Sequence, residues 1–151
     1  MLKRDYEGQV CSIARALEIV GERWTLLIVR DALLGVRRFD GFQRSLGIAR
    51  NVLSDRLGRL VEAGVLVRVP TTERADRFEY RLTEQGRGLA VALTALREWG
   101  DRYLADEPPL LLRRRSDGHP VVTAFVPAGA AEVLTLAEVE AVPGPGRRPR
   151  A

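Results

Sequence analysis

The chain has 151 residues, of which 46% are apolar, and it carries a net charge of +4. A chain of this length accommodates one domain, with or without an extension. The single cysteine, Cys11, excludes an intrachain disulfide and a cysteine-rich zinc site within one chain. No apolar run approaches the roughly 18 residues of a membrane span, and none has the form of a signal peptide. We therefore expect a cytoplasmic protein with no membrane partner.

Two amphipathic helices are predicted near the N-terminus. Residues 9–20 place apolar side chains at helical spacing, and Gly21 follows as a C-cap. Residues 23–34 form the second helix, which ends at Gly35. It is more apolar than the first helix, and we expect it to be more deeply buried.

A helix-turn-helix is predicted next. Phe39, Phe42 and Leu46 share one side of a short helix that ends at Gly47. Residues 48–63 form the following helix, whose core stripe is Leu53, Leu57, Leu60 and Val61. Its opposite face carries Asn51, Asp55, Gly58 and Glu62, with Ser54 and Arg59 on the flanks. Two short helices joined by a small glycine turn are typical of this motif.

The periodicity then changes to that of strands. Residues 65–69 and 78–82 alternate in apolar character on either side of the polar segment 70–77, which predicts a β-hairpin, or wing. Thr83 is the expected N-cap of a long helix that continues to Pro108. Trp99 and Tyr103 lie on its apolar stripe and are interpreted as core or dimer-interface residues. The predicted fold is mainly α with a small β-wing (α+β), a winged helix-turn-helix.

The rest of the chain is less regular. Residues 109–126 suggest a small hairpin that turns at residues 116–119, and residues 130–142 suggest a short helix or strand. Residues 143–151 are rich in Pro, Gly and Arg and are predicted to be disordered. The predicted division is a winged helix-turn-helix domain at 1–106, an extension at 107–142 and a tail at 143–151.

Several segments in this order resemble the HxlR family of winged-helix regulators, which are relatives of the MarR family. The resemblance covers roughly residues 8–105 and rests on CSIARAL (11–17), GERWTLLIVR (21–30), GVRRF (35–39), GIARNVLSDRL (47–57), AGVL (63–66) and EYRLTEQG (79–86). It implies a homodimer that binds double-stranded DNA as a repressor or activator. It also implies that the first and last helices form the dimer interface.

The sequence departs from the family pattern at two places. Many members have a serine where Ala49 stands, so the side-chain cap of the recognition helix, the predicted second helix of the motif at residues 48–63, is missing here. Some members resemble a zinc ribbon in the C-terminal extension, but here the corresponding stretches, DGH (117–119) and FVPAG (125–129), contain no cysteine. His119 alone cannot build a tetrahedral zinc site, so we expect no metal and no cofactor.

Positive charge is concentrated around the predicted recognition helix. Residues 36–60 hold six arginines and two aspartates, an excess equal to that of the whole chain. At the helix start, Arg50 can donate hydrogen bonds to guanine, Asn51 can form a pair of hydrogen bonds with adenine, and Asp55 can accept one from the cytosine amino group. Ser54 lies beside them and is included in the predicted site. Arg59 is expected to meet phosphate or to hold Asp55, one turn earlier. The alternative is that these residues form only a solvated face.

Four further arginines are candidate backbone contacts. Arg74 and Arg77 lie in the wing loop, where Glu73 and Asp76 nearly cancel their charge. Arg37 and Arg38 precede the first helix of the motif, and surface salt bridges are an equally good interpretation for each of them.

Cys11 is a candidate redox sensor, because some family members sense oxidants or electrophiles near this position. A reactive thiol needs access and stabilisation of its anion, which Arg15 or the start of the helix would favour. The alternative is a small hydrophobe buried at the dimer interface. A further alternative is that a small effector binds in a cavity between the helices.

The function predicted from these features is a transcriptional regulator, a repressor in our interpretation, that binds a pseudo-palindromic operator as a homodimer. An oxidant, an electrophile or a small effector would control it. An enzyme is not predicted, because the chain lacks a set of nucleophile, base and acid. The alternative function is a winged-helix module for protein contacts without specific DNA binding.

Overall fold

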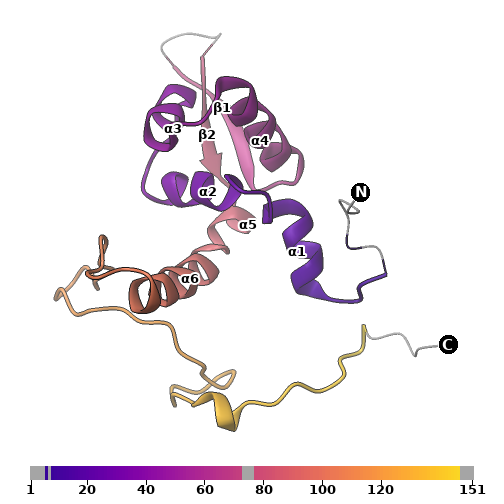
Figure 1. Cartoon of the computed structure of the whole chain (residues 1–151), viewed down its shortest axis with the longest axis vertical. Helices are drawn as coiled ribbons and strands as arrows, with labels where there is room; N and C mark the ends of the chain where they lie inside the picture. The colour runs from indigo at the N-terminus through magenta and orange to yellow at the C-terminus, as the bar shows by residue number, and fades with distance from the viewer. Residues whose placement is uncertain (1–5, 7, 73–76, 147–151) are drawn as a thin grey trace. The chain divides into compact units, whose positions relative to one another are not determined.

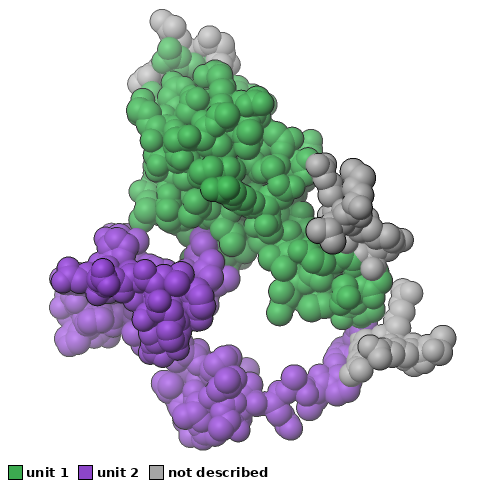
Figure 2. Space-filling view, viewed as in Figure 1, with its two compact units in different colours: residues 1–90 green, residues 91–151 purple. Residues whose placement is uncertain are grey.

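The computed structural model describes residues 6, 8–72 and 77–146, which divide into two compact units, 1–90 and 91–151 (Figure 2). The first unit contains helices α1 to α5 and the β-hairpin, and the second contains almost all of α6 and the C-terminal extension. No helix among the described residues has the length and apolar character to cross a membrane.

Helix α1 spans Ser12–Val20 and α2 spans Thr25–Leu33 (Figure 1). The prediction that the first helix starts at residue 9 is wrong, because Cys11 has extended backbone angles and serves as the N-cap. Ile28 and Val29 of α2 are fully buried, whereas α1 buries only Ala14 and Val20. The second helix is therefore the more buried of the two, as predicted.

Helices α3 (Phe39–Leu46) and α4 (Arg50–Glu62) form the helix-turn-helix. Gly47 joins them at φ 61°, in the left-handed region that glycine adopts without steric cost. Phe42 of α3 is fully buried, and so are Leu53 and Leu57 of α4. Burial of these side chains holds the two helices at a fixed angle, and it confirms the predicted core stripe except at Val61, which is half-buried.

Strands β1 (Leu66–Pro70) and β2 (Phe78–Leu82) pair antiparallel, with Arg68 opposite Tyr80. The Tyr80 amide also donates to the Arg37 carbonyl at 2.8 Å, so the segment before α3 is fixed to the second strand. The wing is confirmed. Its predicted loop residue Arg74 lies outside the described residues.

The predicted long helix after the wing is interrupted. Thr83 caps α5 (Glu84–Arg87), its hydroxyl accepting from the Gly86 amide at 3.1 Å, as expected. A turn at residues 88–89 then separates α5 from α6 (Ala90–Tyr103), so the prediction of one continuous helix is wrong. Two glycines within four residues, Gly86 and Gly88, weaken helix propagation at this point.

In the second unit, Arg97 and Glu98 of α6 fix the extension. Arg97 pairs with Asp101 at 2.7 Å and donates to the Leu110 carbonyl at 3.1 Å. Glu98 accepts from both the amide and the hydroxyl of Thr123. The extension forms isolated bridges and one short 3-10 helix, Leu136–Glu138, in place of regular strands. The predicted turn at residues 116–119 is present, with Gly118 at φ 75°.

Candidate nucleic-acid interface

The outer face of α4 is polar from its first residue onward. Arg50, Asn51 and Ser54 are exposed, while the leucines one turn apart on the opposite side are buried. The four residues predicted to read bases thus share the solvent-facing side of one helix, with Asp55 as the fourth. An α-helix that exposes one polar face in this way fits into the major groove of DNA.

The start of α4 has no side-chain cap, as Ala49 predicted. Its first backbone amides are therefore available to an external acceptor, and the positive end of the helix dipole favours an anion there. Beside this end, the Arg50 guanidinium lies 4.7 Å from the centroid of the Phe39 ring. Among the ion pairs of the described residues, Arg50 has no carboxylate partner. The helix start is the part of α4 best suited to an anionic ligand.

The middle of α4 is different, because its charges are paired. Arg59 contacts Asp55 at 3.1 Å, the i,i+4 pair that the sequence suggested. Sequence reasoning missed two further members of this network. Arg56 contacts Asp55 at 2.6 Å, and it also contacts Glu22, from the turn between α1 and α2, at 2.5 Å.

A groove of about 550 Å³ separates α4 from the wing. Arg50 and Ser54 line one wall, and the strands contribute the opposite wall with Arg68, Phe78 and Tyr80. The Arg68 guanidinium lies over the Phe78 ring, 3.5 Å from its centroid. Glu62 also lines the groove, but arginines on both walls outnumber this one carboxylate, and with the aromatic rings beneath them they make the groove suitable for an anionic chain such as a DNA backbone.

Arg68 was absent from the predicted site, although the strand pattern contained a signal for it. It is the one charged residue in a strand of valines and leucine, and it lies diagonally opposite Phe78 in the register of the hairpin. Such diagonal neighbours are within reach of long side chains.

A second open concavity, of about 490 Å³, lies where α2 leads into α3. Arg37, Arg38 and Arg44 line it together with Asp40 and Glu79. The Arg37 guanidinium is 4.0 Å from the Glu79 carboxylate, which is the longest separation that still counts as a salt bridge. The salt-bridge interpretation therefore holds for Arg37, although the pair is loose. The three guanidinium groups nevertheless face a common space at the surface of the motif.

The other predicted residues lie outside these two concavities. Arg77 is exposed at the loop end of the wing, next to the start of β2, where its carbonyl accepts from the Thr71 amide. Cys11 is exposed at the N-cap of α1. His119 is also exposed, 3.1 Å from Asp117. Arg114 and the His119 amide hold the pKa of Asp117 below its ordinary value. The described residues include no group of three or more metal-ligating side chains.

Comparison with known proteins identifies the family of the chain. The profile of the HxlR-like helix-turn-helix family matches residues 19–108. An uncharacterized HTH-type transcriptional regulator of Mycobacterium tuberculosis is 47% identical over 147 residues, covering 96% of this chain and 92% of the relative.

Two solved structures show the same fold. The crystal structure of PA1607, named as a candidate transcription factor, has a TM-score of 0.79 and 42% identity, covering 91% of this chain and 97% of that one. The reduced form of the transcriptional regulator YodB from Bacillus subtilis has a TM-score of 0.54 and 26% identity, covering 62% and 94%. YodB has also been solved after diamide treatment and with quinone bound. The chain therefore belongs to the HxlR-like helix-turn-helix family, whose members are winged-helix transcriptional regulators of MarR-like fold and not enzymes.

Proposed function

We propose that the protein represses transcription by binding a pseudo-palindromic DNA operator as a homodimer. The observation that carries this proposal is the uncapped start of α4, where Arg50, Asn51 and Ser54 are exposed side by side next to an arginine-lined groove. With α4 in the major groove, these three residues face base edges, because the N-terminal part of a recognition helix lies nearest the bases.

The other arginines contact the backbone in this proposal. Arg68 and Arg77 approach it from the wing, with Arg74 of the wing loop as a further predicted contact, and Arg37 and Arg38 from the segment before α3. Phosphate contacts of this kind fix the position of the protein on the duplex without reading its sequence. Asp55 and Arg59 complete the predicted set and hold each other at the middle of α4.

A homodimer is supported by apolar surface on the first and last helices. Ile13 of α1 is 71% exposed, and Trp99 and Tyr103 of α6 are 55% and 62% exposed. Exposed apolar patches on a folded chain mark interaction sites. Because one helical turn of DNA is about 34 Å long, the dimer would place its two α4 helices about that distance apart, in successive major grooves.

The test is fluorescence anisotropy of the full-length protein on an operator recovered by genomic footprinting, with a shuffled duplex as competitor. Wild type should prefer the operator, and Arg50→Ala should reduce that preference by roughly tenfold, because a bidentate base contact contributes about 1–3 kcal/mol of discrimination. Arg113→Ala, an exposed arginine of the extension, is the control. If no genomic fragment is preferred over the shuffled duplex, the protein is a module for protein contacts instead.

We further propose that the signal is an oxidant or electrophile that modifies Cys11. The thiol is exposed at the start of α1, next to the apolar surface assigned to the dimer, so an adduct there would disturb the contact that spaces the two recognition helices. The diamide and quinone structures of YodB are consistent with such a signal.

The test compares wild type with Cys11→Ser on the operator before and after treatment with a quinone, an electrophile whose ring adds one thiolate and takes up one proton, so that no second thiol is required. Both proteins should bind equally before treatment, and only wild type should be released by the quinone. Equal release of the two proteins would show that Cys11 is not the sensing residue. A small effector bound between the helices would then be the better candidate signal.

A further inference from the structure

We propose that Glu22 is a positioning residue that suppresses non-specific DNA binding by neutralising Arg56 and Arg59 on the recognition helix. The inference rests on the proposed function, since it concerns how the DNA-binding face discriminates among sequences. Glu22 lies outside α4, in the turn between α1 and α2, and it would contribute to specificity without touching DNA.

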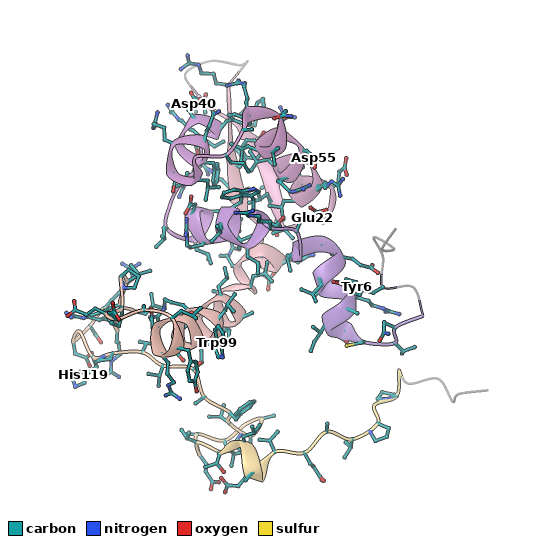
Figure 3. All side chains as sticks on the ribbon, viewed as in Figure 1. Tyr6, Glu22, Asp40, Asp55, Trp99 and His119 are labelled. Atoms are coloured by element: carbon teal, nitrogen blue, oxygen red, sulfur yellow. The ribbon has the colours of Figure 1, made fainter. Side chains whose placement is uncertain are left out.

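The backbone of Glu22 is held in place from its own side of the molecule. Its carbonyl accepts from the Thr25 amide at 3.0 Å, the bond that starts α2. The side chain then reaches α4, 34 residues later in the sequence, where one carboxylate oxygen lies 2.5 Å from Arg56 and the other 3.9 Å from Arg59. Figure 3 shows Glu22 and Asp55 close together, from separate elements.

Arg56 depends on these carboxylates. Its side chain is 17% exposed, its Nη1 contacts Asp55 and its Nη2 contacts Glu22, while its buried Nε has no hydrogen-bond partner. A guanidinium withdrawn from water in this way needs its acidic partners, because an unpaired buried charge is strongly unfavourable.

Together with Arg59, which contacts Asp55 at 3.1 Å, the four groups alternate in sign and carry no net charge. The middle of α4 is therefore electrically neutral, whereas its start carries the unpaired Arg50. Non-specific affinity comes from phosphate neutralisation, and each phosphate contact steepens the dependence of log K on log[salt] by about 0.9. Two arginines whose charges are balanced by carboxylates thus lower non-specific binding while leaving the base-reading residues at the helix start in place.

Removal of the Glu22 charge should leave the cluster with one uncompensated positive charge, and Arg59, which is 56% exposed, is the arginine that can meet a phosphate. For Glu22→Gln we expect the salt slope on a shuffled duplex to become steeper by about 0.9, the contribution of one phosphate contact, and non-specific affinity at low salt to rise roughly threefold to tenfold. Operator affinity should rise less, so that the ratio of specific to non-specific affinity falls. Glutamine keeps the size of the side chain and an oxygen acceptor for Arg56, which separates the effect of charge from that of shape.

The measurement is anisotropy of full-length wild type and Glu22→Gln on operator and shuffled duplexes at several salt concentrations, with circular dichroism as a check on folding. Glu22→Asp, which retains the charge, should keep the wild-type slope. Glu84→Gln, which removes one exposed acid elsewhere in the same unit, should not steepen it by comparable amounts. The double variant Glu22→Gln/Arg59→Gln should lose much of the extra slope.

Two outcomes are distinguishable. If wild type shows no preference for any genomic fragment, the proposed function fails before Glu22 is considered. If wild type discriminates but Glu22→Gln weakens both duplexes equally with an unchanged slope, Glu22 is only a structural tie between the α1–α2 turn and α4, and the inference is wrong.

Discussion

The guanidinium of Arg68 lies over the ring of Phe78, 3.5 Å from its centroid, on a diagonal of the β1–β2 ladder. The ring fixes a long, otherwise mobile side chain on the wall of the groove between the wing and α4. An arginine positioned in advance loses less side-chain entropy when it meets a phosphate than one that is free. The wing thus carries a pre-positioned arginine, Arg68, in strand β1, in addition to the arginines of its loop sequence.

We expect Arg68→Ala to weaken binding to operator and shuffled duplexes alike. Loss of one phosphate contact should reduce the steepness of the salt slope by about 0.9, since that is the contribution of one neutralised phosphate on B-DNA. Anisotropy at four salt concentrations measures both quantities. Phe78→Leu, which removes the ring but keeps the arginine, should lie between wild type and Arg68→Ala. A loss confined to the operator would contradict a backbone role and indicate base reading by Arg68.

Gly86 and Gly58 should respond in opposite ways to alanine. A Cβ on Gly86 would lie 2.2 Å from the Val65 carbonyl oxygen, a backbone atom that cannot move aside cheaply. Gly86→Ala should therefore lower the free energy of unfolding by about 1–3 kcal/mol, the range of overpacked sites. Gly58 stands inside α4 with open space around it, so Gly58→Ala should raise the free energy of unfolding by roughly 0.5–1 kcal/mol.

Urea denaturation followed by circular dichroism compares these two variants with wild type. The sign of each change decides the matter, because both substitutions add the same methyl group to a helix. Equal destabilisation would mean that helix propensity and the close approach of Gly86 to β1 are not the determining factors.

The contact of the extension with α6 should weaken in acid. The Thr123 hydroxyl donates to Glu98 and, with the Thr123 amide, holds the pKa of Glu98 below its ordinary value. A carboxyl whose pKa is lowered by folding stabilises the folded contact above its ordinary pKa, and this stabilisation is lost as the pH falls through the folded-state value. The loss should thus occur below about pH 4.5, the unperturbed value.

The Thr123 amide resonance, followed by NMR from neutral pH downward, reports this transition. Glu98→Gln should remove its pH dependence, because a neutral amide has no proton to gain in this range. Glu132→Gln, an exposed acid of the same extension, should retain the wild-type profile. If the Thr123 amide shows no acid transition in wild type, the Glu98 contact does not persist in solution.

Local patterns were sufficient to predict most of the first unit. The leucines of α4 recur at helical spacing, valines alternate in β1, and Gly47 marks the turn between two helices, so each element could be recognised from a few adjacent residues. The same reasoning failed at residues 88–89, because the apolar stripe continues past the glycines and hides the break. It also placed the start of α1 too early, since Val10 fits the helical repeat although Cys11 is extended.

The candidate site was only partly predictable for a different reason. Arg50 and Asn51 could be assigned from their position on one helix, whereas one of the two acidic partners of Arg56, Glu22, lies 34 residues away. No periodicity connects Glu22 to α4, and only the packing of the α1–α2 turn against that helix brings them together. Long-range ion pairs of this kind require tertiary structure.

The sequence pattern assigns Trp99 either to the core or to the dimer interface, and in the structure Trp99 is not part of the core. Its side chain is 55% exposed and contacts only Tyr103 among aromatic neighbours of the described residues, so the core interpretation is wrong for a single chain. We expect Trp99→Asp to yield a folded monomer, because a charge would have to be desolvated at the contact. Operator affinity should fall by about 10²–10⁴, the gain that linked binding sites provide.

Analytical ultracentrifugation and anisotropy measure the two effects, with Arg115→Asp as a control at an exposed turn. A Trp99→Asp protein that remains dimeric would place the dimer contact elsewhere, and one that is monomeric yet binds the operator at full strength would show that each chain recognises DNA alone.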